Sequence, residues 1–349
     1  MRKLRVVVLI HEGRLPPESI DHIPDEQLEP IKLEFDVISA LQELGHEVFP
    51  VEIGDELSII RRAIEDSQPH ITFNLLTHFH HQAIYTSYVV SYLELLKVPY
   101  TGCNARGLLF ADHKALSKKI MMWHRLPVPR FVLFRRGQTA RKPKRLDFPL
   151  FVKSAAEHAS LGVAQASIVR DVESLKSRVS FIHERVGTDA LVEEYIEGRE
   201  LYVTILGNRR LQACPLWELK FGSLPEGTQP VATRRVKWDE KYRKKLDVSL
   251  ARVEDLSEPL VRRIESVSKR VYRALELSGY ARIDLRLTPE GRFFVLEANP
   301  NADLSYGEVV AESAEAAGIQ YELFVQKLIT LGLRYSPAWK SGEQRSGLF

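Results

Sequence analysis

The fold of this chain is decided by the segment Ala281-Arg-Ile-Asp-Leu-Arg-Leu-Thr-Pro-Glu-Gly-Arg-Phe-Phe-Val-Leu-Glu-Ala-Asn-Pro-Asn301. Its centre, Pro289-Glu-Gly-Arg292, has the composition of a turn and separates two alternating segments, which predicts a β-hairpin. Because side chains alternate along a strand, one face is expected to hold Arg282 and Asp284, with Glu297 and Asn299 from the return strand. The opposite face is expected to be apolar, with Ile283, Leu285, Leu287, Phe294, Leu296 and Ala298.

The polar face of this hairpin is a candidate metal site. Asp284 and Glu297 supply carboxylates and Asn299 an amide oxygen, the hard ligands that Mg²⁺ prefers when water and phosphate complete its shell. An ordinary amphipathic hairpin with a solvated polar face fits the same alternation. The hairpin by itself leaves both interpretations open.

The composition is that of a globular protein with room for two or three domains: 349 residues, 44% hydrophobic and 27% charged. A formal charge of +3 argues for neither a nucleic acid nor a membrane partner. Cys103 and Cys214 show neither metal-ligand spacing nor a disulfide framework, so we expect a reducing compartment. No stretch approaches the roughly 20 apolar residues that span a bilayer, and the apolar run from Leu4 to Ile10 is too short for a signal peptide. A cytoplasmic protein is therefore expected.

Strands alternate with helices up to about residue 110, which predicts a small doubly wound α/β domain over 1–110. We expect strands at 4–10, 47–53 and 70–75, and helices at 31–41, 61–66 and 85–96. A compact middle domain over 111–190 is predicted from a helix at 112–123, strands at 148–153 and 163–169, and a helix at 171–185.

The remaining pattern is dominated by strands and predicts an α+β domain over 191–335. Its expected strands are 190–196, 200–206 and 211–217, followed by a helix that Ser257 opens with Pro259 just inside it. The hairpin comes next, and one last helix is expected at 311–331. The polar residues 336–349 are expected to be a disordered tail.

Two segments upstream of the hairpin carry further candidate residues. Lys153 ends a predicted strand and precedes a small-residue loop with Ser160 and Gly162, which could approach a triphosphate through backbone N–H groups. Glu193 and Glu194 lie with Tyr195 at the end of a strand, where backbone groups could bind an adenine edge and Glu200 could accept hydrogen bonds from a ribose. Each segment alone also fits a common structural unit, a strand–loop–strand or a charged edge strand.

Taken together in order and spacing, these motifs resemble the ATP-grasp ligases, most closely the D-alanine–D-alanine ligase branch. The resemblance covers about residues 4–333. It rests on the segments Val98-Pro-Tyr-Thr-Gly102, Ala111-Asp-His-Lys114, Phe151-Val-Lys153, Ser160-Leu-Gly162, Val192-Glu-Glu-Tyr-Ile196 with Glu200, Glu240-Lys-Tyr242, Arg282-Ile-Asp284 and Glu297-Ala-Asn299.

The resemblance implies an ATP-grasp fold, with ATP between the middle and last domains, and a role for each matching residue. ATP phosphates would be contacted by Lys114 and Lys153 under a loop of Ser160, Leu161 and Gly162, and by Lys241 from a mobile loop. The nucleoside would be held by Glu193, Glu194, Tyr195 and Ile196, largely through backbone, and by Glu200. Two Mg²⁺ ions, for which Mn²⁺ could substitute, would be ligated by Asp284, Glu297 and Asn299, and Arg282 would stabilise the oxyanion of a tetrahedral intermediate.

The chain departs from the family pattern on the substrate side. The family's Gly-Gly-x-Ser-x-Glu segment is replaced by His11-Glu-Gly-Arg-Leu-Pro-Pro-Glu-Ser19, in which Glu12 and Glu18 are candidate substrate contacts. The segment His78-Phe-His-His81 stands where the family has His-Gly-x-x-Gly-Glu-Asp-Gly. His78, His80 and His81 could bind a metal or a substrate carboxylate, or simply line the cleft.

Asp303 is a third departure, at a position near the second substrate where the relatives have glycine. Its carboxylate could bind an ammonium group or cap the helix that follows.

The sequence therefore predicts an ATP-dependent ligase that joins a small carboxylic acid to an amine through an acyl phosphate. A true D-alanine–D-alanine ligase, or an inactive ATP-binding protein, are the alternatives. The expected partners are the two small substrates, without nucleic acid or membrane, and the resemblance also allows a homodimer.

Overall fold

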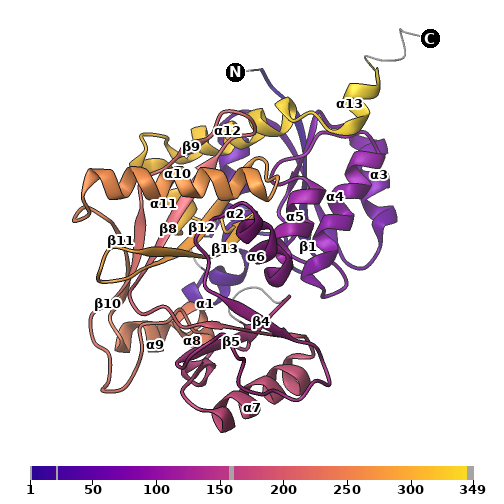
Figure 1. The fold of residues 1–349 in the computed structure, drawn as a ribbon. Helices are drawn as coiled ribbons and strands as arrows, with labels where there is room; N and C mark the ends of the chain where they lie inside the picture. Colours follow the sequence, from indigo (N-terminus) through magenta and orange to yellow (C-terminus); the bar gives the residue numbers. More distant parts are fainter. Residues whose placement is uncertain (1, 21–22, 157–160, 344–349) are drawn as a thin grey trace.

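The computed structural model describes residues 2–20, 23–156 and 161–343, and it arranges them in three β-sheets with surrounding helices (Figure 1). This mixture confirms the predicted α/β class. None of the described helices combines the length and apolar character needed to cross a lipid bilayer.

The first sheet is parallel, with strand order β2-β1-β3. Its strands and flanking helices are β1 (Arg5–His11), α2 (Lys32–Glu43), β2 (Glu47–Ile53), α3 (Leu57–Ser67), β3 (Ile71–Asn74) and α4 (Thr86–Leu95). Central β1 is covered on both faces: Val7 and Leu9 pack with α3 and α4, whereas Val6 and Val8 pack with α2. This explains why the sequence from Val6 to Ile10 is continuously apolar.

A small antiparallel sheet forms the middle of the chain, with order β4-β7-β5-β6. Its elements are β4 (Phe131–Phe134), β5 (Leu150–Ser154), β6 (Ile168–Val169), α7 (Val172–Phe181) and β7 (Ala190–Glu194). The last strand, β7, pairs with β4 and β5, so this sheet extends through Glu194.

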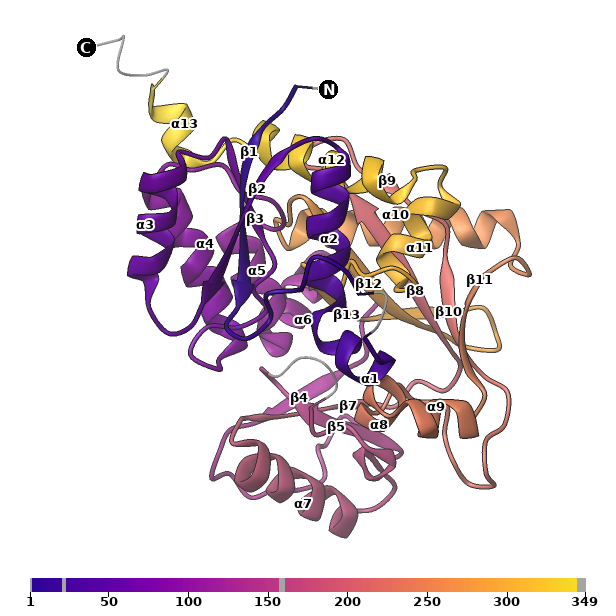
Figure 2. The same cartoon turned by 180° about the vertical axis from the view of Figure 1, so that it is seen from behind.

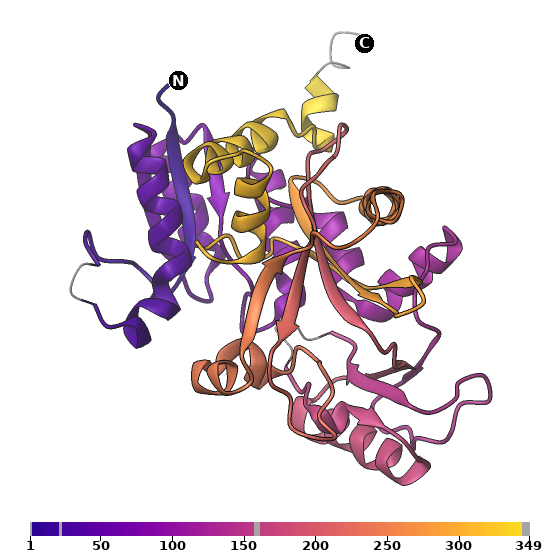
Figure 3. The ribbon, with the colours of Figure 1, turned by 90° about the vertical axis from the view of Figure 1, so that its left-hand side faces the viewer.

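The largest sheet has the order β11-β10-β8-β12-β13, with β9 paired to β8. Its elements are β8 (Arg199–Leu206), β9 (Gln212–Ala213), β10 (Trp217–Phe221), β11 (Val248–Arg252), α10 (Glu258–Ala274), β12 (Tyr280–Leu287) and β13 (Phe293–Pro300). Helix α10 covers its apolar face, where Ile264 and Val271 join the core with Ile283 and Leu285. Figure 3 shows the small magenta sheet beneath the orange strands of this large sheet.

The two ends of the chain pack together. Figure 2 shows helix α2 between the first sheet and the helices α11 (Val309–Ala316) and α12 (Tyr321–Arg334). Val37 and Leu41 of α2 share one buried cluster with Val310 and Phe324. The segment that follows the hairpin is thereby held against the N-terminal part.

Two predicted elements are wrong in extent because local breaks interrupt them. The predicted helix at 311–331 is two helices, separated at Gly318, whose φ of +79° ends α11. The helix predicted at 112–123 forms as α6 (Lys114–Trp123), where His113 accepts a hydrogen bond from the Leu116 N–H to cap it, and a separate helix, α5 (Ala105–Asp112), precedes it. The strand predicted at 211–217 divides into β9 and the start of β10.

The predicted disordered tail is wrong at its start. Residues Ala338–Glu343 form the short helix α13, whereas 344–349 lie outside the described residues. Lys340 anchors α13 by donating hydrogen bonds to the carbonyl oxygens of Leu333 and Tyr335.

The decisive hairpin forms as predicted, but its return strand contains a bulge. β12 and β13 pair antiparallel with Arg282 opposite Asn299 and Asp284 opposite Glu297, and the register then shifts so that Leu285 faces Val295. An extra residue reverses the alternation beyond it. Phe293 and Val295 therefore join the core with Ala298, and the prediction for Phe294 and Leu296 is wrong.

This bulge predicts different costs for two adjacent phenylalanines. Phe293 is 4% exposed in the core, whereas Phe294 is partly exposed on the other face. We expect Phe293→Ala to lower the free energy of unfolding by about 3–5 kcal/mol, because it leaves a cavity. Phe294→Ala is the matched control and should cost about 1 kcal/mol or less. Urea unfolding of both variants tests the register, and equal losses would contradict it.

Candidate functional site

A cleft with an open volume of about 790 Å³, which includes adjoining solvent, lies between the small and large sheets. One part of its lining is apolar, formed by Phe151, Leu161, Val163, Tyr195, Ile196, Val231, Ala232 and Leu296. The other part is charged, formed by Lys114, Lys153, Glu193, Glu194, Glu200, Asp284, Arg286 and Glu297. The cleft can therefore accept a ligand with a flat apolar end and an anionic end.

A buried carboxylate lies between two lysines at the charged end. Glu193 on β7 has Lys153 Nζ 2.8 Å from Oε1 and Lys118 Nζ 2.9 Å from Oε2. Burial opposes ionisation of Glu193, but the two ammonium groups hold the pKa of its carboxyl below the ordinary value. Burial lowers the pKa of the Lys118 ammonium, while Glu193 opposes that effect. The group thus places two cations next to the cleft.

The hairpin presents its polar face to the same cleft. Arg282 binds Asp284 with two hydrogen bonds, Nε to Oδ1 at 2.8 Å and Nη2 to Oδ2 at 3.0 Å. Lys114 Nζ lies 3.2 Å from Oε2 of Glu297. Asn299 faces Arg282 across the strands, and its buried Nδ2 has no hydrogen-bond partner among the described residues. Two carboxylates and an amide are an oxygen-donor set suited to Mg²⁺.

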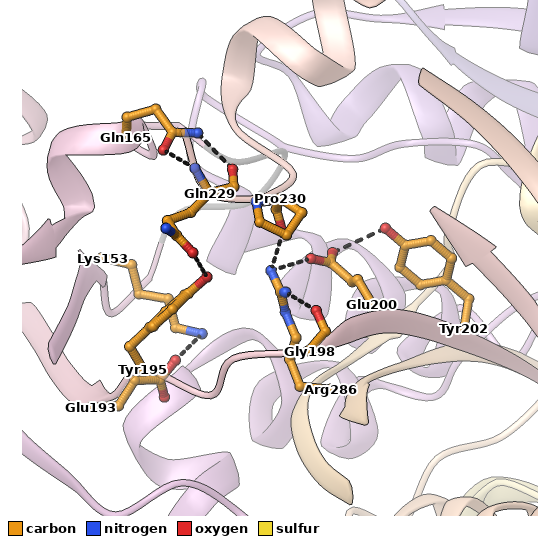
Figure 4. Close-up of polar contacts among 10 residues, drawn as sticks. All are labelled: Lys153, Gln165, Glu193, Tyr195, Gly198, Glu200, Tyr202, Gln229, Pro230 and Arg286. Atoms are coloured by element: carbon orange, nitrogen blue, oxygen red, sulfur yellow. Dashed lines mark hydrogen bonds and ion pairs between the residues drawn. The ribbon is translucent and has the colours of Figure 1, made fainter. Parts of the chain in front are cut away.

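A second network stabilises the strand ends around the cleft (Figure 4). Arg286 donates to the carbonyl oxygens of Gly198 and Pro230, each at 2.7 Å, and its Nη2 lies 3.1 Å from Oε2 of Glu200. The hydroxyl of Tyr202 donates to the other oxygen of Glu200 at 3.0 Å. Glu200 is therefore held in one orientation at the edge of the cleft.

The loop over the apolar end is joined to the small sheet. Gln165 and Gln229 exchange two hydrogen bonds, at 2.9 and 3.0 Å, and the Tyr195 hydroxyl donates to Oε1 of Gln229 at 3.3 Å (Figure 4). The Tyr195 and Phe151 rings stack with their centroids 6.4 Å apart. These contacts position an aromatic wall that suits a flat, apolar ring.

Most residues predicted for nucleotide and metal binding meet in this cleft. The predicted residues in its lining are Lys114, Lys153, Leu161, Glu193, Glu194, Tyr195, Ile196, Glu200, Asp284 and Glu297. Arg282 and Asn299 lie beside them on the hairpin. The side chain of Glu194 is engaged by Arg130, whose Nε donates to it at 2.7 Å. Ser160 lies outside the described residues.

Other predicted residues lie away from the cleft lining. Gly162 is in a left-handed conformation, with φ of +73°, where an added Cβ would approach Val186 to 2.9 Å. Lys241 is exposed on the short helix α9 (Glu240–Lys245). Asp303 does not cap the next helix, because its Oδ1 accepts hydrogen bonds from the backbone and hydroxyl of Ser305 while Glu308 occupies the cap position of α11.

Among the predicted substrate residues of the N-terminal part, His78 and His81 lie near His11 at the end of β1. The His78 ring stacks on His11 with centroids 3.9 Å apart, and His81 lies 5.7 Å from His78. His80 points to Asp55, at 3.4 Å, while Glu12 and Glu18 are exposed. Across the part of the chain that the structure describes, no three histidine, cysteine or acidic side chains form a metal-binding group.

The sequence analysis did not identify Lys118 and Arg286, although the spacing of each from a predicted site residue indicates that it shares that residue's face. Lys118 follows Lys114 by one helical turn and so shares its face. Arg286 continues the alternation of Arg282 and Asp284 along β12. Val231 and Ala232, by contrast, reach the cleft from an irregular loop whose sequence has no comparable pattern.

The buried Lys118–Glu193 pair predicts a large stability effect. Lys118→Met keeps the volume but leaves Glu193 with one cation, so we expect a loss of about 3 kcal/mol in the free energy of unfolding. The exposed neighbour Lys119 provides the control, and Lys119→Met should change it by no more than about 0.5 kcal/mol. Equal urea midpoints for the two variants would disprove the stabilising role.

Comparison with known proteins identifies the family. A family model described as D-ala D-ala ligase C-terminus matches residues 120–330. An uncharacterized protein of Sinorhizobium fredii is 32% identical over 304 residues, covering 85% of this chain and 86% of that protein. The D-alanine–D-alanine ligase of Desulforudis audaxviator is 30% identical over 298 residues, with 84% and 90% covered.

A solved structure shares the whole fold. The D-alanine–D-alanine ligase of Bacillus anthracis, determined in complex with ATP, superimposes with a TM-score of 0.74 at 22% identity, covering 97% of this chain and 99% of that one. The matching family model and the relatives therefore show that this chain belongs to the D-alanine–D-alanine ligase family of ATP-grasp proteins.

Proposed function

We propose that this chain is an ATP-dependent ligase that joins a carboxylate to an amine and binds ATP between its small and large sheets. The observation that carries the proposal is the cleft itself, in which an aromatic wall, buried lysines and the hairpin carboxylates meet. An inactive binding protein would have no need of this complete set. Family membership supports the same activity.

The apolar part of the cleft suits adenine and the charged part suits the triphosphate. We assign the base to the space beside Phe151 and Tyr195, with the backbone of residues 194–196 at its edge, and the ribose to Glu200. Lys114 and Lys153 would then contact phosphate oxygens. Both ammonium groups are paired with carboxylates here, so phosphate would share or replace these partners.

The hairpin is the proposed site for two Mg²⁺ ions, held by Asp284, Glu297 and Asn299. When bound, Mg²⁺ would neutralise charge on the phosphates. In this structure Asp284 forms an ion pair with Arg282, and Glu297 forms one with Lys114. Lys241 is a candidate contact to the γ-phosphate only if α9 moves towards the cleft, because its side chain is exposed on that helix.

The reaction follows from these positions. An oxygen of the substrate carboxylate bonds to the γ-phosphorus, the bond to ADP breaks, and an acyl phosphate forms. The neutral amine then attacks the acyl carbon, phosphate leaves and the amine loses a proton, giving an amide. Arg282 would stabilise the oxyanion of the tetrahedral intermediate, because it lies beside Asp284 with its charge held in place.

The proposed substrates are an amino acid, a peptide or a similar small acid together with an amine. The names of the relatives favour D-alanine in both roles, as the second candidate. The sequence departures around His78 and Asp303 favour other substrates.

A screen for ADP release decides between these candidates. Acids are paired with amines in the presence of Mg-ATP, and products are identified by mass spectrometry. We expect faster release with a pair other than two D-alanines. Fastest release with D-alanine alone would establish the second candidate, and no release with any pair would overturn the ligase assignment.

Removing one hairpin carboxylate should abolish most of this activity. We expect Glu297→Gln to slow ADP release by about 10²–10³, the usual cost of one well-placed charged group. Glu290→Gln, in the exposed turn of the same hairpin, is the control and should keep the parent rate. Equal rates for the two variants would exclude Glu297 from the site.

A further inference from the structure

The side chains that hold Glu200 come from two neighbouring strands of the large sheet. Glu200 on β8 lies directly opposite Arg286 on β12 in the antiparallel pairing, and Tyr202 lies opposite Asp284. Residues opposite each other share a face of the sheet, as do residues two apart along one strand. These four side chains therefore form one polar face, from which Glu200, Asp284 and Arg286 line the cleft.

Arg286 is fixed by three acceptors (Figure 4). The side chain is buried, and its Nη1 donates to the carbonyl oxygen of Gly198 at 2.7 Å. Its Nη2 donates to the carbonyl oxygen of Pro230 at 2.7 Å and to Oε2 of Glu200 at 3.1 Å. Both hydrogens of Nη2 are thereby used, so the guanidinium group keeps its orientation. The planar group sets the direction of the Glu200 carboxylate as well as opposing its charge.

Tyr202 fixes the other oxygen of the same carboxylate. Its hydroxyl donates to Oε1 of Glu200 at 3.0 Å, and the side chain is buried. The guanidinium carbon of Arg282 lies 4.9 Å from the centroid of the Tyr202 ring, a cation–π contact that holds the ring in place. The two oxygens of Glu200 are therefore held by two different residues, and the carboxylate cannot rotate without losing both.

Glu200 keeps acceptor capacity for a ligand. An ionised carboxylate has about four lone-pair sites, two on each oxygen. Arg286 and Tyr202 occupy one site on each oxygen, which leaves one site on each. Because Glu200 lines the cleft while it is only 8% exposed, little water competes for these sites. Two vicinal hydroxyl groups would supply one donor to each oxygen.

We propose that Arg286 and Tyr202 are positioning residues that hold the Glu200 carboxylate for the two vicinal hydroxyls of a ribose, so that the cleft selects ribonucleotides over deoxyribonucleotides. This inference rests on the proposed function, because it assumes that ATP binds with its ribose at Glu200. A deoxynucleotide leaves an acceptor of the buried carboxylate without its donor. Because the carboxylate cannot turn to another donor, the missing hydroxyl is costly.

Matched nucleotides test the selection in the assay for release of the nucleoside diphosphate. ATP, 2′-deoxy-ATP and 3′-deoxy-ATP are compared as their Mg complexes, with an acid and amine pair that the enzyme uses. We expect kcat/KM for ATP to exceed that of either deoxynucleotide by at least about tenfold. The difference should lie mainly in KM, because the ribose contacts are the same before and during the reaction. Equal kcat/KM for the three nucleotides would overturn the inference and leave the ligase function standing.

Variants then assign the selection to the two positioning residues. Arg286→Met should reduce the preference for ATP over 2′-deoxy-ATP by about tenfold, and Tyr202→Phe by about threefold or more. The preference compares two nucleotides on one sample, so a loss of folded protein cancels. Arg292→Met, in the exposed turn of the hairpin, is the control and should keep the preference. A preference that survives Arg286→Met or Tyr202→Phe would overturn the role of that residue.

A double variant shows whether Arg286 acts through Glu200. Glu200→Gln should by itself remove most of the preference, because the amide group offers one acceptor oxygen in place of two. Adding Arg286→Met to Glu200→Gln should then change the preference by no more than about twofold, since coupled residues are not additive. A further tenfold loss would show that Arg286 acts independently of Glu200 and would contradict the positioning role. Tyr202→Phe, which removes a single oxygen atom, keeps the inference testable if Arg286→Met fails to fold.

A binding measurement separates failure of this inference from failure of the proposed function. If no acid and amine pair reacts, the ligase function fails, and calorimetric titration with Mg-ATP and Mg-2′-deoxy-ATP still decides the selection. Tighter binding of ATP that is reduced in Tyr202→Phe would support it, and indistinguishable affinities would overturn it. Absence of binding by both nucleotides would overturn the ATP site and the selection together.

Discussion

The structure of the cleft depends on one buried ionic contact, Glu193 between Lys118 and Lys153. Lys118 comes from α6, whereas Glu193 and Lys153 lie on neighbouring strands of the small sheet. A charge in a protein interior is costly unless an opposite charge pairs with it. The burial of Glu193 therefore requires the two lysines beside it. The apolar residues Ala115 and Leu191 pack beside them and exclude water. The same contact therefore attaches the small sheet to α6, the helix that carries Lys114. It also orients the lysines in the charged part of the cleft.

The hairpin contributes a second constraint, through its bulge. Direct pairing of Asp284 with Glu297 places the two carboxylates side by side, and the bulge immediately beyond them turns Leu296 towards the cleft. A regular ladder would have placed Leu296 in the core and Val295 in the ligand space. Because of this one extra residue, β13 contributes side chains to the core, to the apolar part of the cleft lining and to the carboxylate pair.

The part of the molecule around α2 is built from opposite ends of the chain. Helix α2 shares a buried cluster with α11 and α12, and the backbone N–H of Tyr306 donates to Oδ2 of Asp36 although these residues are far apart in sequence. The cleft, in contrast, is lined mainly by residues from the middle and last parts of the chain.

The sequence by itself determined the hairpin, the parallel first sheet, the polar face with Asp284, Glu297 and Asn299, and the family. Alternation, turn composition and motif order are local or ordered along the chain, so they can be seen without a structure. The tertiary structure alone decided the bulge at Leu296, the pairing of Lys118 with Glu193 and the burial of Glu34. These features depend on which distant surfaces pack together, because burial turns an ordinary lysine or glutamate into a paired or unsatisfied charge. No pattern within α2 or α6 specifies that environment.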